Sequence, residues 1–204
     1  MKITEADRTK IQQIIKTAEE KTSGEFVPVV LQSSDHYPAA HYRLASICAV
    51  ITSLLTYKFI SFEDPIILIW ATLTGLLSGY LLGYLPWLKM LFTTKEEVQE
   101  ETYQRALQSF FELGVTNTKR RTGVMIYLSI LERKVFIFAD AGINQVVPAN
   151  YWDEQVQTLI ASLKEDNFIT GLQTVITQIG EKLNTNFPIT DDDTNELENR
   201  LVTD

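Results

Sequence analysis

The residue with the clearest potential for chemistry is an aspartate at the end of an apolar segment. Asp140 follows the segment KVFIFA and precedes Gly142. A carboxylate at a strand end can hold a hard cation such as Ca²⁺ or Mg²⁺, because ligands in α/β folds bind at strand ends. The alternative is a structural role, because aspartate is also a preferred turn former that bonds the backbone.

Two further carboxylates flank the first predicted strand. Glu25 begins the segment EFVPVVL, and Asp35 follows it after a short polar stretch. Either side chain could join Asp140 in a cation site if the strands that carry them are neighbours. Otherwise both are solvated surface carboxylates, which is the commoner state of acidic residues.

The remaining polar motifs give little support for catalysis. His36 and His41 lie five residues apart, and the chain lacks the further close ligands that zinc requires. It also has no G-x-S-x-G elbow, P-loop, H-E-x-x-H or C-x-x-C motif. The basic run Lys119–Arg121 either touches anionic lipid headgroups or is a solvated loop.

The elements that must position these residues alternate between helices and strands. The periodicity of the apolar residues predicts a helix over 4–23, a strand over 25–31, a helix over 94–113, strands over 123–130 and 134–140, a helix from Asn150 and a helix over 168–183. The strands are almost continuously apolar, as is typical of strands with both faces covered. The predicted fold is an α/β sandwich in which helices cover a mixed β-sheet.

Two long apolar runs interrupt this pattern between the first strand and the next helix. Residues 44–62 contain one charge, Lys58, and residues 66–88 contain none. A helix crosses a bilayer core with about 20 mostly apolar residues, so the runs predict a transmembrane hairpin. Only Glu63, Asp64 and Pro65 separate them.

Three glycines recur at every fourth position of the second run. Gly75, Gly79 and Gly83 would share one helix face and allow close backbone approach. The first run could pack there through its own small residues, or another subunit or partner protein could do so. A homo-oligomer is therefore one possible arrangement.

The charges near the apolar runs predict the orientation. Arg43, Lys89, Lys95 and Arg105 lie on the side of the polar segments, whereas Lys58 lies near the connection between the runs. Because basic residues favour the cytoplasmic side, we expect an integral membrane protein with two spans and both termini in the cytoplasm.

The net charge of −8 is concentrated at the C-terminus. Residues 189–204 contain six acidic residues and one basic residue, Arg200. This composition predicts an acidic disordered tail. The rest of the chain is nearly balanced, which argues against nucleic acid as a partner.

The stretch from Tyr103 to Trp152 resembles the TPM domain family. The motifs that carry the resemblance are, in order, a helix with Tyr103, Ala106 and Phe110 that ends at Leu113–Gly114, the strand start Thr122–Gly123–Val124, the segment Asp140–Ala141–Gly142–Ile143, and Trp152. The chain is thereby divided into a first helix and strand (1–43), the hairpin (44–88), the rest of a TPM-like domain (89–188) and the tail (189–204).

The resemblance implies two classes of function. Some family members are described as acid phosphatases or bind divalent cations, and others are accessory or assembly factors of membrane complexes. Bacterial relatives with such a hairpin often accompany a LemA-type membrane protein, which implies a partner of that kind in a bacterial inner membrane. We therefore expect an accessory or scaffold protein, with a cation-dependent phosphatase built around Asp140 as the alternative.

Overall fold

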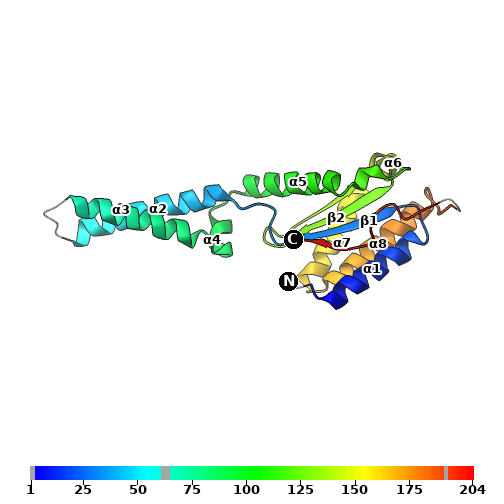
Figure 1. The fold of residues 1–204 in the computed structure, drawn as a ribbon, viewed down its shortest axis with the longest axis horizontal. Coiled ribbons are helices and arrows are strands. Elements are labelled where there is room, and N and C mark those ends of the chain that lie inside the picture. The colour runs from blue at the N-terminus through cyan, green and yellow to red at the C-terminus, as the bar shows by residue number, and fades with distance from the viewer. Residues whose placement is uncertain (1–2, 61–64, 191–192) are drawn as a thin grey trace. The chain divides into compact units, whose positions relative to one another are not determined.

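A computed structural model describes residues 3–60, 65–190 and 193–204 as two compact units (Figure 1). The first unit contains Met1–Ser34 and Thr102–Asp204, and the second contains Asp35–Glu101. The described residues form eight α-helices, one short 3-10 helix and four strands. The first unit is the α/β part of the chain, and the second holds both apolar runs.

The elements of the first unit follow the predicted order. They are α1 (Glu5–Glu19), β1 (Glu25–Leu31), α5 (Lys95–Glu112, which begins in the second unit), η1 (Val115–Asn117), β2 (Gly123–Ser129), β3 (Lys134–Ala139), α6 (Ala141–Asn144), α7 (Ala149–Lys164), α8 (Phe168–Asn184) and β4 (Val202–Thr203). The three predicted strands are confirmed to within one residue at each end.

The four strands form one mixed sheet in the order β3-β2-β1-β4. β1 runs parallel to β2, with Glu25 opposite Gly123. β3 is antiparallel to β2, and β4 pairs in parallel with β1 at Val29 and Val30. The predicted mixed sheet is therefore present, with one strand more than the sequence indicated.

Helices cover both faces of this sheet, which explains why its central strands are apolar throughout. Alternate residues of β1 and β2, such as Phe26 and Ile126, face a cluster built with α1, α7 and α8. The residues between them, such as Val29 and Tyr127, face a second cluster with Ala106 of α5. The two-residue period of a strand divides its side chains between two cores in this way, and the predicted sandwich is confirmed.

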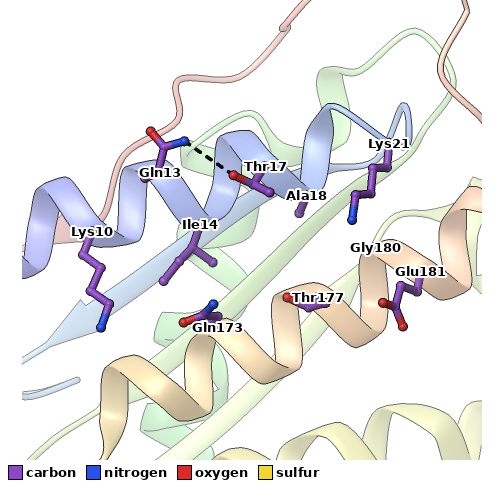
Figure 2. A pocket seen from close by; sticks show the side chains of 10 residues that line it. All are labelled: Lys10, Gln13, Ile14, Thr17, Ala18, Lys21, Gln173, Thr177, Gly180 and Glu181. Atoms are coloured by element: carbon purple, nitrogen blue, oxygen red, sulfur yellow. Dashed lines mark hydrogen bonds between the residues drawn. The ribbon is translucent and has the colours of Figure 1, made fainter.

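α1 and α8 lie side by side on the larger of these cores. A groove of about 260 Å³ runs between them, and Lys10, Gln173 and Glu181 are among its lining residues (Figure 2). Gly180 also lines the groove, where a Cβ would meet the Cβ of Ala18 at 3.5 Å. This position therefore has room for a small side chain.

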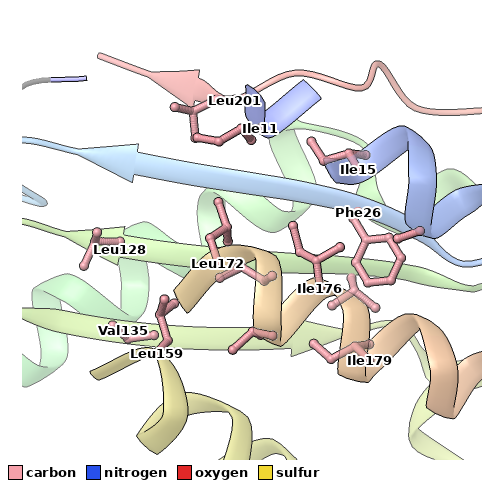
Figure 3. Close-up of a cluster of buried hydrophobic side chains, with 14 of the residues drawn as sticks. Ile11, Ile15, Phe26, Leu128, Val135, Leu159, Leu172, Ile176, Ile179 and Leu201 are labelled. Carbon is pink, nitrogen blue, oxygen red and sulfur yellow. The ribbon is translucent and has the colours of Figure 1, made fainter. Parts of the chain in front are cut away.

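The larger core is built mainly from aliphatic side chains of α1 and α8 on the sheet (Figure 3). Ile11, Ile15, Leu172 and Ile176 are all fully buried. Leu201 from the C-terminal segment is buried among them. Each such side chain stabilises the fold by about 1.5–3 kcal/mol relative to exposure.

The structure differs from the predicted disordered tail. Val202–Thr203 form β4, and the Asp204 carboxylate accepts hydrogen bonds from the Gln32 N–H at 3.0 and 3.1 Å. The charge of the segment suggested disorder, but its apolar residues supply enough buried surface to dock it. Asp191 and Asp192 lie outside the described residues.

The second unit contains α2 (Pro38–Phe59), α3 (Ile66–Leu82) and α4 (Pro86–Leu91). The second apolar run is thus two helices and not one. Pro86 disfavours a helical conformation at the residue before it, and Leu85 is extended, with φ −74° and ψ 119°. Among the described residues, only α2 is long and apolar enough to cross a membrane. One of the two predicted spans is therefore supported by length and composition, and the second, α3, is shorter than predicted. Residues 61–64, with Glu63 and Asp64, lie outside the described residues.

The glycine repeat of α3 faces α2. A Cβ on Gly75 would lie 2.6 Å from the Ala49 Cα, and one on Gly79 would lie 2.6 Å from the Ala45 Cα. A Cβ on Gly83 would lie 2.5 Å from the Nδ1 of His41. All three glycines therefore permit close approach of α3 to α2. Of the alternatives left open by the sequence, this is packing against the first apolar run of the same chain.

Two glycines of α8 should respond oppositely to the same substitution. Gly180→Ala should raise the free energy of unfolding by up to about 1 kcal/mol, because alanine is the better helix former and its Cβ fits. Gly171→Ala should lower it by about 1–3 kcal/mol, because the new Cβ would lie 2.4 Å from the Cβ of Ser162. Chemical unfolding of the full-length protein in mild detergent, followed by circular dichroism, measures both. Equal effects would contradict the packing of α8.

Candidate functional site

Glu25 and Asp140 lie at the same end of the sheet, on either side of Gly123. The Glu25 N–H donates to the Thr122 carbonyl at 3.1 Å, and the Asp140 N–H donates to the Gly123 carbonyl at 2.9 Å. β2 separates the strands that carry them, so their Cα atoms are about 10 Å apart at the usual strand spacing. The two strands are therefore not neighbours, and each carboxylate has partners of its own.

Asp140 is a buried carboxylate that already has a cationic partner. Its side chain is 3% exposed, and Oδ1 accepts a hydrogen bond from the Ala141 N–H at 2.6 Å. Oδ2 lies 2.7 Å from the Nε of Arg121, without an aligned hydrogen bond from any described group. Because Arg121 neutralises this carboxylate, a divalent cation would have to displace the guanidinium.

A close contact between two loops brings Arg121 to Asp140. Arg121 has a left-handed backbone, with φ 58°. A Cβ on Gly142 would lie 2.6 Å from the Arg120 carbonyl oxygen and 2.7 Å from that of Arg121. Only glycine leaves room for this approach, so Gly142 serves the ion pair and the cap that Asp140 makes at α6.

Each member of the basic run is bonded within the first unit. The Lys119 N–H donates to Glu196 Oε2 at 2.9 Å, and its Nζ lies 3.7 Å from Oε1 of the same residue. Arg120 Nη1 donates to the Ser23 Oγ at 3.1 Å. Together with the pair at Asp140, these contacts tie the loop before β2 to the rest of the sheet end. The sequence had suggested either contact with lipid headgroups or a solvated loop, and neither includes this structural role.

Glu25 is buried and not a solvated surface carboxylate. Its two oxygens accept hydrogen bonds from the N–H groups of Glu196 and Leu197 at 3.1 and 3.2 Å, and burial raises the pKa of its carboxyl. It thus holds the C-terminal segment against β1. Asp35 belongs to the second unit, where its Oδ2 accepts from the Tyr37 N–H at 2.7 Å.

Glu19 is a half-buried carboxylate that sequence reasoning missed. It accepts hydrogen bonds from the Phe26 N–H at 2.9 Å and from the Asn199 side chain, and burial raises its pKa to about 8. It borders a cavity of about 260 Å³ together with Glu25 and Asp193. Glu19 lies four residues after Ile15 and therefore on the apolar face of the helix. This spacing could have indicated from the sequence that its carboxylate is shielded from solvent.

Glu132 forms a second buried network at the opposite end of β1 and β2. Its carboxylate accepts hydrogen bonds from the Ser34 N–H at 2.8 Å, from the Ser33 Oγ at 3.1 Å and from the Ser129 Oγ. Ser129 is 0% exposed, so a substrate cannot reach its hydroxyl. The network fastens the β2–β3 turn to the end of β1, and no local pattern in the sequence marks it.

A metal site is therefore not evident in this geometry. Within residues 3–60, 65–190 and 193–204, no three His, Cys, Asp or Glu side chains are gathered closely enough to hold a metal ion. The carboxylates at the sheet end instead accept backbone N–H groups or pair with arginine. Such an arrangement holds loops and the C-terminal segment in place.

The comparisons with known proteins agree with this fold. Residues 89–182 match the model of a family described as the TPM domain, so the resemblance seen in the sequence is confirmed and the chain carries a TPM domain. The NMR structure of the BA42 protein from the psychrophilic bacterium Bizionia argentinensis is similar, with a TM-score of 0.62 and 22% identity over 100% of this chain and 97% of that one. This likeness concerns the fold alone. No curated protein matches the chain.

Two substitutions separate the structural role of Asp140 from cation binding. Asp140→Ala should lower the free energy of unfolding by about 0.5–2 kcal/mol through loss of the helix cap. Asp140→Asn should cost less, because asparagine caps equally well and Arg121 can turn to solvent. Thermal unfolding with and without about 5 mM Ca²⁺ or Mg²⁺ gives the comparison, because that concentration exceeds the dissociation constants of protein Ca²⁺ sites. A rise in melting temperature that the wild type shows and Asp140→Asn lacks would support a cation site instead.

The raised pKa of Glu19 makes stability depend on pH. In the folded chain its carboxyl stays protonated up to about pH 8, whereas its ordinary value is 4.5. Between these two pH values the folded state therefore binds more protons than the unfolded state. The contribution of Glu19 to the free energy of unfolding is lost as pH rises through about 8. Glu19→Gln should flatten the fall in unfolding free energy from pH 5 to 8, and Glu20→Gln on the exposed side should not. An unchanged slope in Glu19→Gln would contradict the burial.

Proposed function

We propose that the second unit inserts into a lipid bilayer and holds the TPM domain beside a membrane complex, for which the protein is an accessory or scaffold factor. The outward face of α2 and α3 carries this proposal. Leu54, Trp70 and Leu77 are 62%, 64% and 63% exposed, and most of the large exposed apolar side chains described lie between Tyr42 and Leu91. Apolar patches of such extent mark membrane or protein interaction sites.

The inward face of the same helices is small and polar, which is the reverse of a water-soluble helix pair. Thr52 Oγ1 donates to the Ala71 carbonyl at 2.9 Å, and the hydroxyls of Ser53 and Thr72 lie 2.8 Å apart. Small residues and interhelical hydrogen bonds associate helices in lipid, where apolar side chains gain nothing by meeting each other. The arrangement therefore suits a hydrocarbon environment.

Helix length is also compatible with insertion. α2 has 22 residues, which span about 33 Å at 1.5 Å per residue, close to the 30 Å of a bilayer core. Only 28% of its most apolar stretch is buried, unlike a core helix of a soluble protein. α3 has 17 residues, and a short span can be accommodated by local thinning of the bilayer.

A charged pair lies at the end of the hairpin that continues into the TPM domain. Arg43 and Glu97 form two hydrogen bonds of 2.6 and 2.7 Å, and those bonds lower the pKa of Glu97 to about 2. A pair that stays ionised belongs in the headgroup region, not in the hydrocarbon. With the basic residues nearby, this favours a cytoplasmic location for this end and for both termini.

The alternative, a divalent-cation-dependent phosphatase, rests on the family, whose model is named for a phosphatase. Its best candidate residue, Asp140, is paired with Arg121. The scaffold role needs no such site, and it gives the anchored domain a fixed place near other membrane proteins. A LemA-type protein or a second copy of this chain is the partner that we propose.

Insertion can be tested by alkaline extraction of membranes from expressing cells. We expect the wild type to stay in the membrane pellet. Leu54→Lys with Leu77→Lys should release it, because each lysine near a span centre costs about 2.5–3.5 kcal/mol on insertion. Phe111→Lys, at an exposed apolar position of the TPM domain, is the matched control and should remain in the pellet. Release of the wild type would refute insertion.

The same membranes test the accessory role against the phosphatase. Extraction in mild detergent should recover a stoichiometric membrane partner with a tagged copy, and a clean monomer would count against a scaffold. Metal-stimulated hydrolysis of a phosphomonoester that Asp140→Asn abolishes would favour the enzyme.

A further inference from the structure

A cavity of about 300 Å³ in the second unit is lined by one lysine, two histidines and several tyrosines. Its walls include His36, His41 and Lys89 and the tyrosines Tyr42, Tyr80 and Tyr84. None of the described residues that line it is acidic. Lysine, histidine and tyrosine all carry hydrogen-bond donors, so the composition suits an anion.

The His41 ring, which is 7% exposed, has a fixed place in the wall of the cavity. Its Nδ1 lies 3.2 Å from the Tyr80 carbonyl oxygen, and a carbonyl oxygen only accepts. Nδ1 therefore carries a proton and donates to that carbonyl, and Nε2 of the neutral ring is an acceptor. His41 thus shapes the cavity wall, and the donors for an anion come from Lys89 and the other lining side chains. The ring packs edge-on against Tyr84, with centroids 4.8 Å apart, and Gly83 makes room for it.

The other two basic side chains are not neutralised within the chain. Neither His36 nor Lys89 makes an ion pair or side-chain hydrogen bond with any described residue, whereas Arg43 nearby in sequence is fully engaged by Glu97. The carboxylate next to His36 is that of Asp35, which accepts a hydrogen bond from the Tyr37 N–H. The positive charge of Lys89 therefore remains available at this cavity.

The neighbourhood of the cavity decides which anion fits. Tyr42 and Tyr84, which line it, are exposed, and so are Trp87 and Leu91 of α4, the helix that carries Lys89. Tyrosine and tryptophan are enriched at membrane–water interfaces, and lysine binds phosphate as a point charge. A ligand here would have a phosphate in the cavity and acyl chains along the exposed apolar side chains of α2 and α3.

We propose that this cavity binds the phosphate of an anionic phospholipid headgroup and thereby fixes the depth of the hairpin in the bilayer. The proposal rests on the insertion of the second unit. It gives Gly83 a purpose beyond helix packing, because a larger residue there would displace the His41 ring. It also assigns roles to His36 and Lys89, whose side chains make no hydrogen bond or ion pair with a described residue.

The test is lipid binding by the purified full-length protein in mild detergent. Native mass spectrometry with short-chain phosphatidylglycerol, phosphatidylcholine of the same chain length and inorganic phosphate would compare the three ligands. We expect preferential retention of phosphatidylglycerol. Lys89→Gln should weaken that binding on the order of fivefold, as expected for one lysine near an anionic surface, and addition of His36→Gln should weaken it further.

Three controls make the result specific. Lys58→Gln removes the same charge at the other end of α2 and should leave binding unchanged. Lys89→Arg keeps the charge and should preserve binding, and added salt should weaken the binding of the wild type. The salt series needs no variant, so it applies even if Lys89→Gln does not fold.

Several outcomes would overturn the proposal. Equal binding of the two lipids, or no effect of Lys89→Gln in a folded protein, would exclude a headgroup site. Inorganic phosphate that binds as tightly as phosphatidylglycerol would indicate a site for a free anion. If alkaline extraction retains the wild type in membranes but no lipid preference is found, only this proposal fails; if extraction releases it, insertion fails too.

Discussion

The parallel pairing of β1 with β2 is the constraint on which the rest of the structure depends. Parallel neighbours require a long crossover between them, and here residues 32–122 form that connection. The crossover supplies both the second unit and α5, whose Ala106 and Phe110 cover one face of the sheet. The elements outside it, α1, α7 and α8, cover the other face. One pairing thus determines where an insertion can enter the fold without disturbing either core.

The buried carboxylates of the TPM domain hold distant segments together. Glu19 and Glu25 bind the C-terminal segment, Glu132 binds the end of β1, and Asp140 binds the loop before β2. Each desolvated carboxylate is costly unless hydrogen bonds or a cation compensate it, and each has such partners. These residues therefore explain how the loops and the C-terminal segment are held against the sheet.

The second unit follows different packing rules. Glycines, alanines and hydroxyl groups meet between α2 and α3, and large apolar side chains face outward. The basic and aromatic residues gather instead at the end where Lys89 and His41 lie. The insertion that we propose accounts for these distributions, because hydrocarbon accepts the apolar face and headgroups accept the end with Lys89.

The sequence by itself determined the elements that local periodicity encodes. Apolar spacing indicated β1, β2, β3 and the helices around them, and short motifs indicated the TPM domain. Run length suggested one helix over residues 66–88, and the break before Pro86 was found only in the structure. Only the tertiary structure decided which carboxylates are buried and that the acidic tail docks, because their partners lie far away in the chain: Glu25 bonds Glu196, and Asp204 bonds Gln32. Local composition records charge and hydropathy, but a pairing across some 170 residues exists only once the sheet has formed.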